Sequence, residues 1–125
     1  MESKAALSIL IVEDDVIACE LIGIVLEHQF PGSVIYTANS GIQGLELFKK
    51  YLPFLVISDV NMSELNGIQL AREIKSIKDD TRFIVLTGSS DQKQMEIFKE
   101  LDVIDYIVKP VEFKRLFAAV QSAYE

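Results

Sequence analysis

Short apolar runs rich in isoleucine, valine and leucine alternate along the chain with longer segments in which apolar and polar positions are mixed. Runs of this length and composition are typical of strands buried on both faces of a parallel sheet. They occur at residues 7–12, 33–38, 54–58, 83–86 and 104–108. We therefore predict that each of these runs forms a buried strand.

The segments between these runs carry apolar residues at the spacing of an α-helix. Three sets each fall on one helix face: Ile17, Leu21, Ile24 and Val25; Leu70, Ile74 and Ile77; and Phe113, Leu116, Phe117 and Val120. Residues 41–51 and 92–101 show a weaker pattern of the same kind. We predict a helix in each segment, with N-terminal caps at Asp15, at Asn39 or Ser40, and at Asp91.

Strict alternation of strand and helix predicts an α/β fold with a parallel sheet, right-handed crossovers and helices on both faces. The length of 125 residues suits one compact domain, so we expect residues 1–125 to form a single unit. The last predicted helix runs to the end of the sequence. The chain is therefore expected to be either a complete one-domain protein or one domain of a longer one.

Composition narrows the possible partners and the compartment. The formal net charge is −7, and an acidic domain repels the phosphate backbone, so we expect no direct nucleic-acid binding. No apolar run reaches the roughly 18 residues of a membrane span, so we expect no membrane insertion. The single cysteine, Cys19, cannot form an internal disulfide, which fits a reducing cytoplasm.

Chemically useful side chains follow four of the predicted strands. In open α/β sheets, ligands bind beyond the carboxyl ends of the strands, at the point where strand order reverses. The residues at these ends are Glu13, Asp14 and Asp15; Asp59, Val60 and Asn61; Thr87, Gly88 and Ser89; and Lys109 and Pro110. If the first and third strands are neighbours, Asp14 and Asp59 converge. A hard divalent cation such as Mg²⁺ would relieve their repulsion.

The remaining polar groups suit a phosphoryl acceptor. Asp59 can act as the nucleophile, as carboxylates do in aspartyl-phosphate chemistry. Lys109 supplies a compact positive charge for a phosphate oxygen, and Thr87 supplies a hydroxyl donor. Because positioning and charge neutralisation supply most of the catalysis in phosphoryl transfer, these parts suffice. For Asp15 we favour a helix-capping role.

The spans ILIVEDD, LVISDVNMSELNG, IVLTGSS and YIVKP resemble the receiver domain of two-component response regulators. The resemblance covers essentially the whole chain, with the motifs in order at the ends of four predicted strands. It implies a flavodoxin-like fold with strand order 2-1-3-4-5. It also implies a phosphorelay signalling switch, in which a sensor histidine kinase or histidine phosphotransfer protein phosphorylates Asp59 and a downstream effector protein or domain responds.

The resemblance further assigns roles to the residues at the strand ends. Asp14 and Asp59 would ligate Mg²⁺ together with the backbone carbonyl of Asn61, and Glu13 would act mainly through an intervening water. Lys109 would pair with the phosphoryl group. The domain would be a stoichiometric acceptor and not a turnover enzyme, with Mg²⁺-dependent self-phosphorylation and autodephosphorylation as its only chemistry.

Signal readout is also implied by the resemblance. Thr87 would bond to the phosphoryl group and move inward, and Tyr106 would swing between exposed and buried rotamers in step with it. This would change the face formed by the fourth helix, fifth strand and fifth helix, which would contact a target or form a homodimer with a second receiver. The Lys109–Pro110 bond is expected to be cis.

Some positions depart from the family pattern. Ser63 stands where a proline is usual, and Asp102 and Val103 replace the usual Gly-Ala before the fifth strand. These changes fall in loops, so we expect them to affect the local backbone and not the chemistry. Asn61 and Ser89 occupy positions that tune hydrolysis of the acyl phosphate in the family, and both are neutral here.

Two alternative functions remain open at this point. The first is a Mg²⁺-dependent phosphohydrolase with an aspartyl nucleophile, but such enzymes usually carry a second acid two residues past the nucleophile, where this chain has Asn61. The second is a degenerate receiver that serves purely as a binding module. Against it, every key polar position of the motifs is present.

Overall fold

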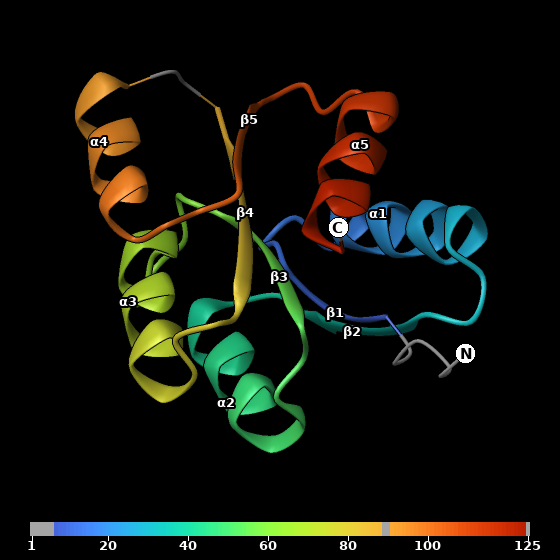
Figure 1. Cartoon of the computed structure of the whole chain (residues 1–125), viewed down its shortest axis with the longest axis horizontal. Helices are drawn as coiled ribbons and strands as arrows, with labels where there is room; N and C mark the ends of the chain where they lie inside the picture. The colour runs from blue at the N-terminus through green and yellow to red at the C-terminus, as the bar shows by residue number, and fades with distance from the viewer. Residues whose placement is uncertain (1–6, 89–90, 125) are drawn as a thin grey trace.

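The computed structural model describes residues 7–88 and 91–124, and in them strands and helices alternate as predicted (Figure 1). The strands are β1 (Ser8–Val12), β2 (Val34–Ala38), β3 (Leu55–Asp59), β4 (Arg82–Thr87) and β5 (Asp105–Val108). The helices are α1 (Val16–Gln29), α2 (Gly41–Tyr51), α3 (Gly67–Ile77), α4 (Gln92–Glu100) and α5 (Phe113–Ala123). Neighbouring strands are parallel in the order β2-β1-β3-β4-β5, which confirms the predicted flavodoxin-like fold.

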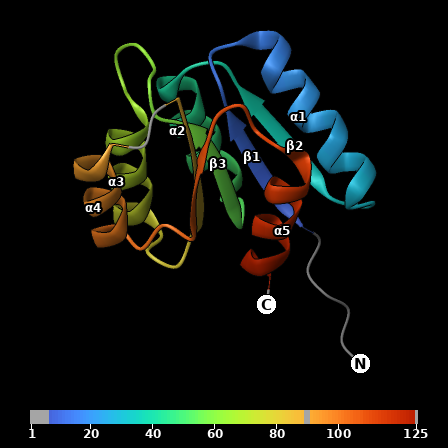
Figure 2. The same cartoon turned by 90° about the horizontal axis from the view of Figure 1, so that it is seen from above.

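Helices cover both faces of the sheet. α1 and α5 lie on one face and α2, α3 and α4 on the other, as Figures 1 and 2 show. Alternate residues of β1 serve the two layers: Ile9 and Ile11 pack in the core with α1 and α5, and Leu10 and Val12 pack in the other core. All four are fully buried, and each such side chain contributes roughly 1.5–3 kcal/mol relative to exposure.

The apolar set that marks α1 in the sequence does share a helix face, but much of that face is turned to solvent. The exposed fractions of Ile17, Leu21 and Ile24 are 79%, 47% and 62%. A different apolar set of α1 packs on the sheet: Cys19, Ile22 and Leu26. The helix is therefore apolar on two sides, and spacing alone did not reveal which side enters the core.

Polar caps fix where the helices begin. The predicted caps are confirmed at Asp15, Ser40 and Asp91, whose side chains accept backbone N–H hydrogen bonds at 3.1, 3.1 and 2.9 Å. Such a cap typically stabilises a helix by about 1 kcal/mol. Of the two candidates before α2, Ser40 is the cap. The Asn39 side chain instead donates a hydrogen bond to the backbone carbonyl of Glu13 at 3.0 Å.

Asp102 occupies the left-handed backbone region, with φ of 59°, in the loop where the family usually has glycine. The turn is thus kept despite the substitution, at the cost of strain that glycine avoids. We expect Asp102→Gly to raise the free energy of unfolding by roughly 0.5 kcal/mol in urea denaturation. Asp79→Gly is the matched control, because Asp79 is also exposed but has no positive φ, and it is expected to give no gain. Equal effects of the two changes would contradict this account.

Candidate functional site

Three carboxylates meet at the carboxyl ends of β1 and β3, which are neighbours in the sheet. One oxygen from each of Glu13, Asp14 and Asp59 can be chosen so that all three lie within 4.8 Å of one another. Glu13 and Asp59 are buried, with exposed fractions of 2% and 5%, whereas Asp14 is exposed. The predicted convergence of Asp14 and Asp59 at the point where strand order reverses is therefore confirmed.

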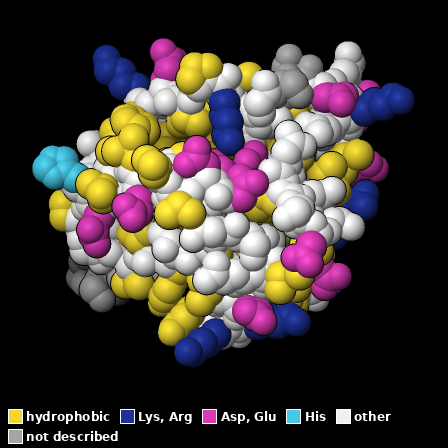
Figure 3. Space-filling model, turned by 180° about the vertical axis from the view of Figure 1, so that it is seen from behind, with side chains coloured by type: hydrophobic (Ala, Val, Ile, Leu, Met, Phe, Trp, Pro, Cys, Tyr) yellow, Lys and Arg dark blue, Asp and Glu magenta, His cyan; other side chains and the backbone are white. Residues whose placement is uncertain are grey.

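Lys109 reaches into this acidic group from the end of β5. Its Nζ lies 3.1 Å from Glu13 Oε1 and 3.2 Å from Asp59 Oδ2, so one ammonium bridges the two buried carboxylates. The peptide bond that follows, Lys109–Pro110, is cis as expected. Figure 3 shows acidic side chains gathered close to a basic one on the side of the molecule opposite to the view of Figure 1.

The pKa directions follow from this arrangement. Burial raises the pKa of Glu13, and the charge of Asp59 adds to the rise, while hydrogen bonds from the Asp15 N–H and Lys109 offset only part of it. Burial also disfavours the Lys109 ammonium. Its contacts with Glu13 and Asp59 outweigh that effect and raise the pKa of Lys109 above its ordinary value. The lysine therefore stays charged at neutral pH and partly neutralises the carboxylates.

The other predicted site residues lie around this centre. Thr87 is fully buried at the end of β4, and its carbonyl accepts a hydrogen bond from the Lys109 N–H at 2.6 Å. Asn61 is exposed, two residues beyond Asp59. Tyr106 of β5 contacts α4, where its hydroxyl donates a hydrogen bond to Gln94 Oε1 at 3.3 Å. Ser89 lies outside the described residues, and so does its predicted role in tuning hydrolysis of the acyl phosphate.

Backbone contacts that the sequence did not reveal hold the acids in place. Two hydrogen bonds join the backbone of Glu13 to the end of β2. The Asn39 side chain donates to the Glu13 carbonyl, and the Glu13 N–H donates to the Ala38 carbonyl, each at 3.0 Å. Ser58 Oγ donates to the Asp59 carbonyl at 2.8 Å. Asn39 and Ser58 are uncharged and belong to no metal-ligand motif. Only their position next to strand ends could have identified them as supports of the site.

The donor set fits a hard divalent cation. All three groups supply carboxylate oxygens, which Mg²⁺ prefers, and they are close enough to share one ion. One lysine supplies a single positive charge against the three acids. The cluster therefore keeps an excess of negative charge that a cation would neutralise.

A sequence model of the response regulator receiver domain matches residues 9–121. A Priestia megaterium protein named "Probable C4-dicarboxylate response regulator DctR" is 29% identical over 95% of this chain and 52% of its own length. Transcriptional regulatory protein ZraR of Escherichia coli K12 is 33% identical over 94% of this chain and 26% of its own. The chain thus spans about half or less of these curated relatives.

Solved structures agree with the sequence comparison. A response regulator receiver domain protein of Clostridium thermocellum superposes with a TM-score of 0.88 at 30% identity, over 96% of this chain and 94% of that one. Chemotaxis protein CheY4 of Vibrio cholerae, at 22% identity and a TM-score of 0.86, shares the fold over 95% of this chain and 99% of that one. This chain belongs to the response regulator receiver domain family.

Receiver domains of this family are phosphoacceptor signalling domains in two-component systems, so the chain is a signalling domain of that class. Receiver domains typically bind Mg²⁺, and the cluster of Glu13, Asp14 and Asp59 could hold a metal ion. In the part of the chain that the structure describes, no helix combines the length and the hydrophobicity needed to cross a membrane.

Proposed function

We propose that residues 1–125 form one phosphorelay receiver unit in which Asp59 accepts a phosphoryl group from the phosphohistidine of a sensor histidine kinase or histidine phosphotransfer protein. The observation that carries this proposal is the placement of Lys109 Nζ between the buried carboxylates of Glu13 and Asp59, at 3.1 and 3.2 Å. This placement brings together a nucleophile (Asp59), a positive charge (Lys109) and an excess of carboxylates at the point where strand order reverses.

Glu13, Asp14 and Asp59 are the side chains that would hold Mg²⁺, with the backbone carbonyl of Asn61 as a further oxygen ligand. The bound cation would neutralise charge on the phosphoryl oxygens as Asp59 approaches them. Asp14, as the exposed acid of the cluster, is the one most open to solvent-borne ions. Glu13 is already paired with Lys109 and is the better placed to act through a water.

In the transfer step, a carboxylate oxygen of Asp59 attacks phosphorus while the phosphorus–nitrogen bond of the phosphohistidine breaks. The bonding pair returns to that imidazole nitrogen while the other ring nitrogen keeps a proton, so the donor leaves as a neutral imidazole and Asp59 carries an acyl phosphate. Lys109 then exchanges its contact with Asp59 for a phosphoryl oxygen, and the Thr87 hydroxyl donates to another. The acyl phosphate carries roughly −1.5 to −2 charges where the Asp59 carboxylate carried about −1, and this change in charge and size is the signal.

Intact mass spectrometry with a small acyl-phosphate donor tests the proposal. With Mg²⁺, we expect the wild-type chain to gain one phosphoryl group. With a chelator in place of Mg²⁺, we expect the gain to fall by more than about tenfold, because charge neutralisation at the acids is lost. No gain with Mg²⁺ would favour a pure binding module. Steady multiple turnover of a phosphomonoester would favour a phosphohydrolase.

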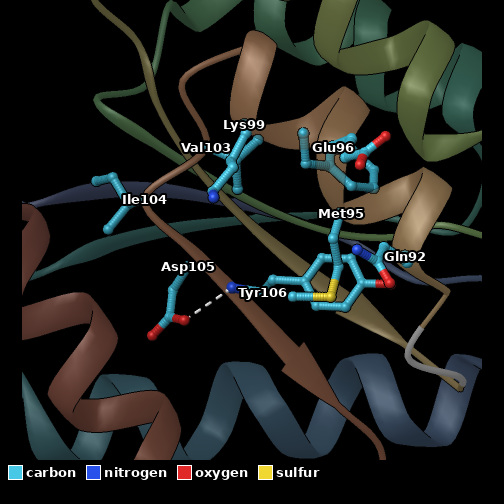
Figure 4. A pocket seen from close by; sticks show the side chains of 9 residues that line it. Gln92, Met95, Glu96, Lys99, Val103, Ile104, Asp105 and Tyr106 are labelled. Atoms are coloured by element: carbon cyan, nitrogen blue, oxygen red, sulfur yellow. Dashed lines mark hydrogen bonds between the residues drawn. The ribbon is translucent and has the colours of Figure 1, made fainter.

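The output surface is proposed to be the α4–β5–α5 face. A cavity of about 670 Å³ lies between α4 and β5, lined by Met95, Tyr106 and neighbouring side chains (Figure 4). The Tyr106 ring is 5.8 Å from that of Phe98, so a change in its rotamer would reshape the cavity. This face is proposed to contact an effector or a second receiver. Hydrogen exchange that is unchanged there on phosphorylation would count against it.

The donor surface is proposed to include the exposed apolar face of α1, with Ile17, Leu21 and Ile24. This helix begins directly after the acidic residues, and Leu21 lines a cavity of about 270 Å³ that also contains Glu13 and Lys109. A docked helical donor would cover the apolar side chains and bring its histidine close to Asp59. The net charge of −7 does not prevent a donor from docking on this face, because the contact is made by apolar side chains.

Ile17→Ser tests this surface, and the same change at Ile42, an exposed position of α2, is the control. With a kinase core that phosphorylates the wild type, we expect Ile17→Ser to slow transfer about tenfold, because roughly 1–2 kcal/mol of apolar contact is lost. Ile42→Ser should transfer normally. Both variants should react with the small phosphodonor at the wild-type rate. Equal transfer rates for the two variants would contradict the assignment.

A further inference from the structure

β2 forms one outer edge of the sheet and pairs only with β1 among the described strands. The Val34 N–H donates to the Leu7 carbonyl at 2.6 Å, and the Ala38 carbonyl accepts from the Glu13 N–H at 3.0 Å. Because the direction of backbone groups alternates along a strand, Val34 and Ala38 face β1 and the backbone groups of Ile35 and Thr37 point outward. The edge therefore presents two N–H and two C=O groups in a row.

This edge lacks the features that usually prevent strand pairing. Residues 33–39 contain no charged residue and no proline, and the register with β1 runs without a bulge. The opposite edge differs, because β5 carries Asp105, which forms an ion pair with Arg115 of α5. Val34 and Thr37 of β2 are exposed. Of the two outer strands, β2 is the one open to pairing.

Apolar side chains flank the β2 edge on both faces. On the α2 side, the Tyr36 ring stacks on that of Tyr51 with centroids 4.3 Å apart, and Tyr51 is still 43% exposed. On the α1 side, the Ile35 side chain packs near Gly23, and the adjacent Ile24 is 62% exposed. A strand added at this edge would therefore find hydrogen-bonding groups in the middle and apolar surface above and below.

We propose that β2 pairs antiparallel with β2 of a second copy of this chain, about a two-fold axis at Tyr36. In this register, Ile35 of one copy faces Thr37 of the other, and each pair exchanges two N–H···O=C bonds. Every outward donor then meets an acceptor. The two sheets join into one continuous sheet, and the partner covers Tyr51 and Ile24.

A second copy is the occupant that this edge fits best. An isologous interface requires a self-complementary patch, and an antiparallel strand edge with its axis on a residue has that property. The chain carries a net charge of −7, so two copies repel wherever charged surfaces meet. The uncharged edge avoids such pairs. β2 and the proposed output face lie at opposite ends of the sheet, so pairing leaves both Asp59 and that face accessible.

Cysteine cross-linking tests the register. Tyr36 is a non-hydrogen-bonded pair with itself across the axis, where opposed Cβ atoms come within disulfide reach. We expect Tyr36→Cys to give a covalent dimer under copper-phenanthroline oxidation. Val34→Cys should not, because Val34 would face Ala38 of the second copy. Wild type controls for the buried Cys19. Cross-linking of Tyr36→Cys no greater than that of Val34→Cys would overturn the proposal.

Sedimentation equilibrium tests the interface without cross-links. We expect wild type to dimerise below about 0.5 mM. Thr37→Lys should weaken dimerisation by at least about tenfold, because each lysine would face Ile35 of the other copy and place a charge in the uncharged edge. Ile77→Lys, at an exposed position of α3, is the control and should dimerise normally. Phosphorylation by the small donor confirms that both variants fold. A monomeric wild type, or a Thr37→Lys variant that dimerises as tightly as Ile77→Lys, would overturn the proposal.

Discussion

Replacing Asp59 with asparagine is expected to reduce Mg²⁺-dependent phosphorylation by a small phosphodonor by more than about a hundredfold. The amide has the shape of the carboxylate but is a very weak nucleophile, so no acyl phosphate forms. It also removes one acid from the cluster with Glu13 and Asp14, which weakens the hold on the cation. Intact mass after incubation with donor and Mg²⁺ measures the effect directly.

The matched control is Asp15→Asn. Asp15 belongs to the same acidic run, but its side chain accepts the Ala18 N–H at the start of α1, and asparagine caps helices equally well. This variant should be phosphorylated at nearly the wild-type rate. Labelling of Asp59→Asn at the level of Asp15→Asn would mean that another residue accepts the phosphoryl group.

The resting site already resembles the state that phosphorylation requires. Lys109 is held between Glu13 and Asp59, so its ammonium lies where a phosphoryl oxygen on Asp59 would need it. The buried acids would repel each other and an incoming phosphate without it. Since the contacts raise the pKa of Lys109, the charge does not depend on small changes of pH near neutrality. In the proposed reaction, Lys109 would therefore keep its charge and exchange its contact with Asp59 for one with a phosphoryl oxygen.

The alternation of buried strands and amphipathic helices, and the polar residues at strand ends, were readable from the sequence because both depend on local pattern. Convergence of Asp14 and Asp59 followed once strand order was inferred. The core-facing side of α1 did not follow, because Ile17 and Ile22 are equally apolar and only packing distinguishes them. The hydrogen bond from the Asn39 side chain to the Glu13 carbonyl joins residues far apart in the chain, so no local sequence pattern predicts it.

Gly67 connects the fold to the site more directly than its place at the start of α3 suggests. Its N–H donates to the Val60 carbonyl at 2.8 Å. A Cβ there would lie 2.5 Å from the Asp59 carbonyl oxygen and 2.8 Å from Val60 Cα. Both are backbone atoms that cannot rotate away. The glycine therefore allows α3 to begin directly against the end of β3 that carries Asp59, the proposed phosphoacceptor.

Gly67→Ala is accordingly expected to lower the free energy of unfolding by roughly 1–3 kcal/mol, as overpacking does. Alanine is the better helix former by about 1 kcal/mol, so propensity alone predicts the opposite sign. Because the clash falls on Asp59, phosphorylation by the small donor should slow as well. Urea denaturation and intact mass measure the two effects.

Gly88→Ala provides the comparison that separates a clash from a general loss of glycine. Gly88 also adjoins the site, directly after Thr87, but a Cβ there would meet no atom of the described residues within 4 Å, and its φ is not positive. We expect its stability to stay within about 0.5 kcal/mol of wild type. If Gly67→Ala proved as stable as Gly88→Ala, the close approach of α3 to the end of β3 would not constrain Asp59, whose position would then depend on its side-chain contacts alone.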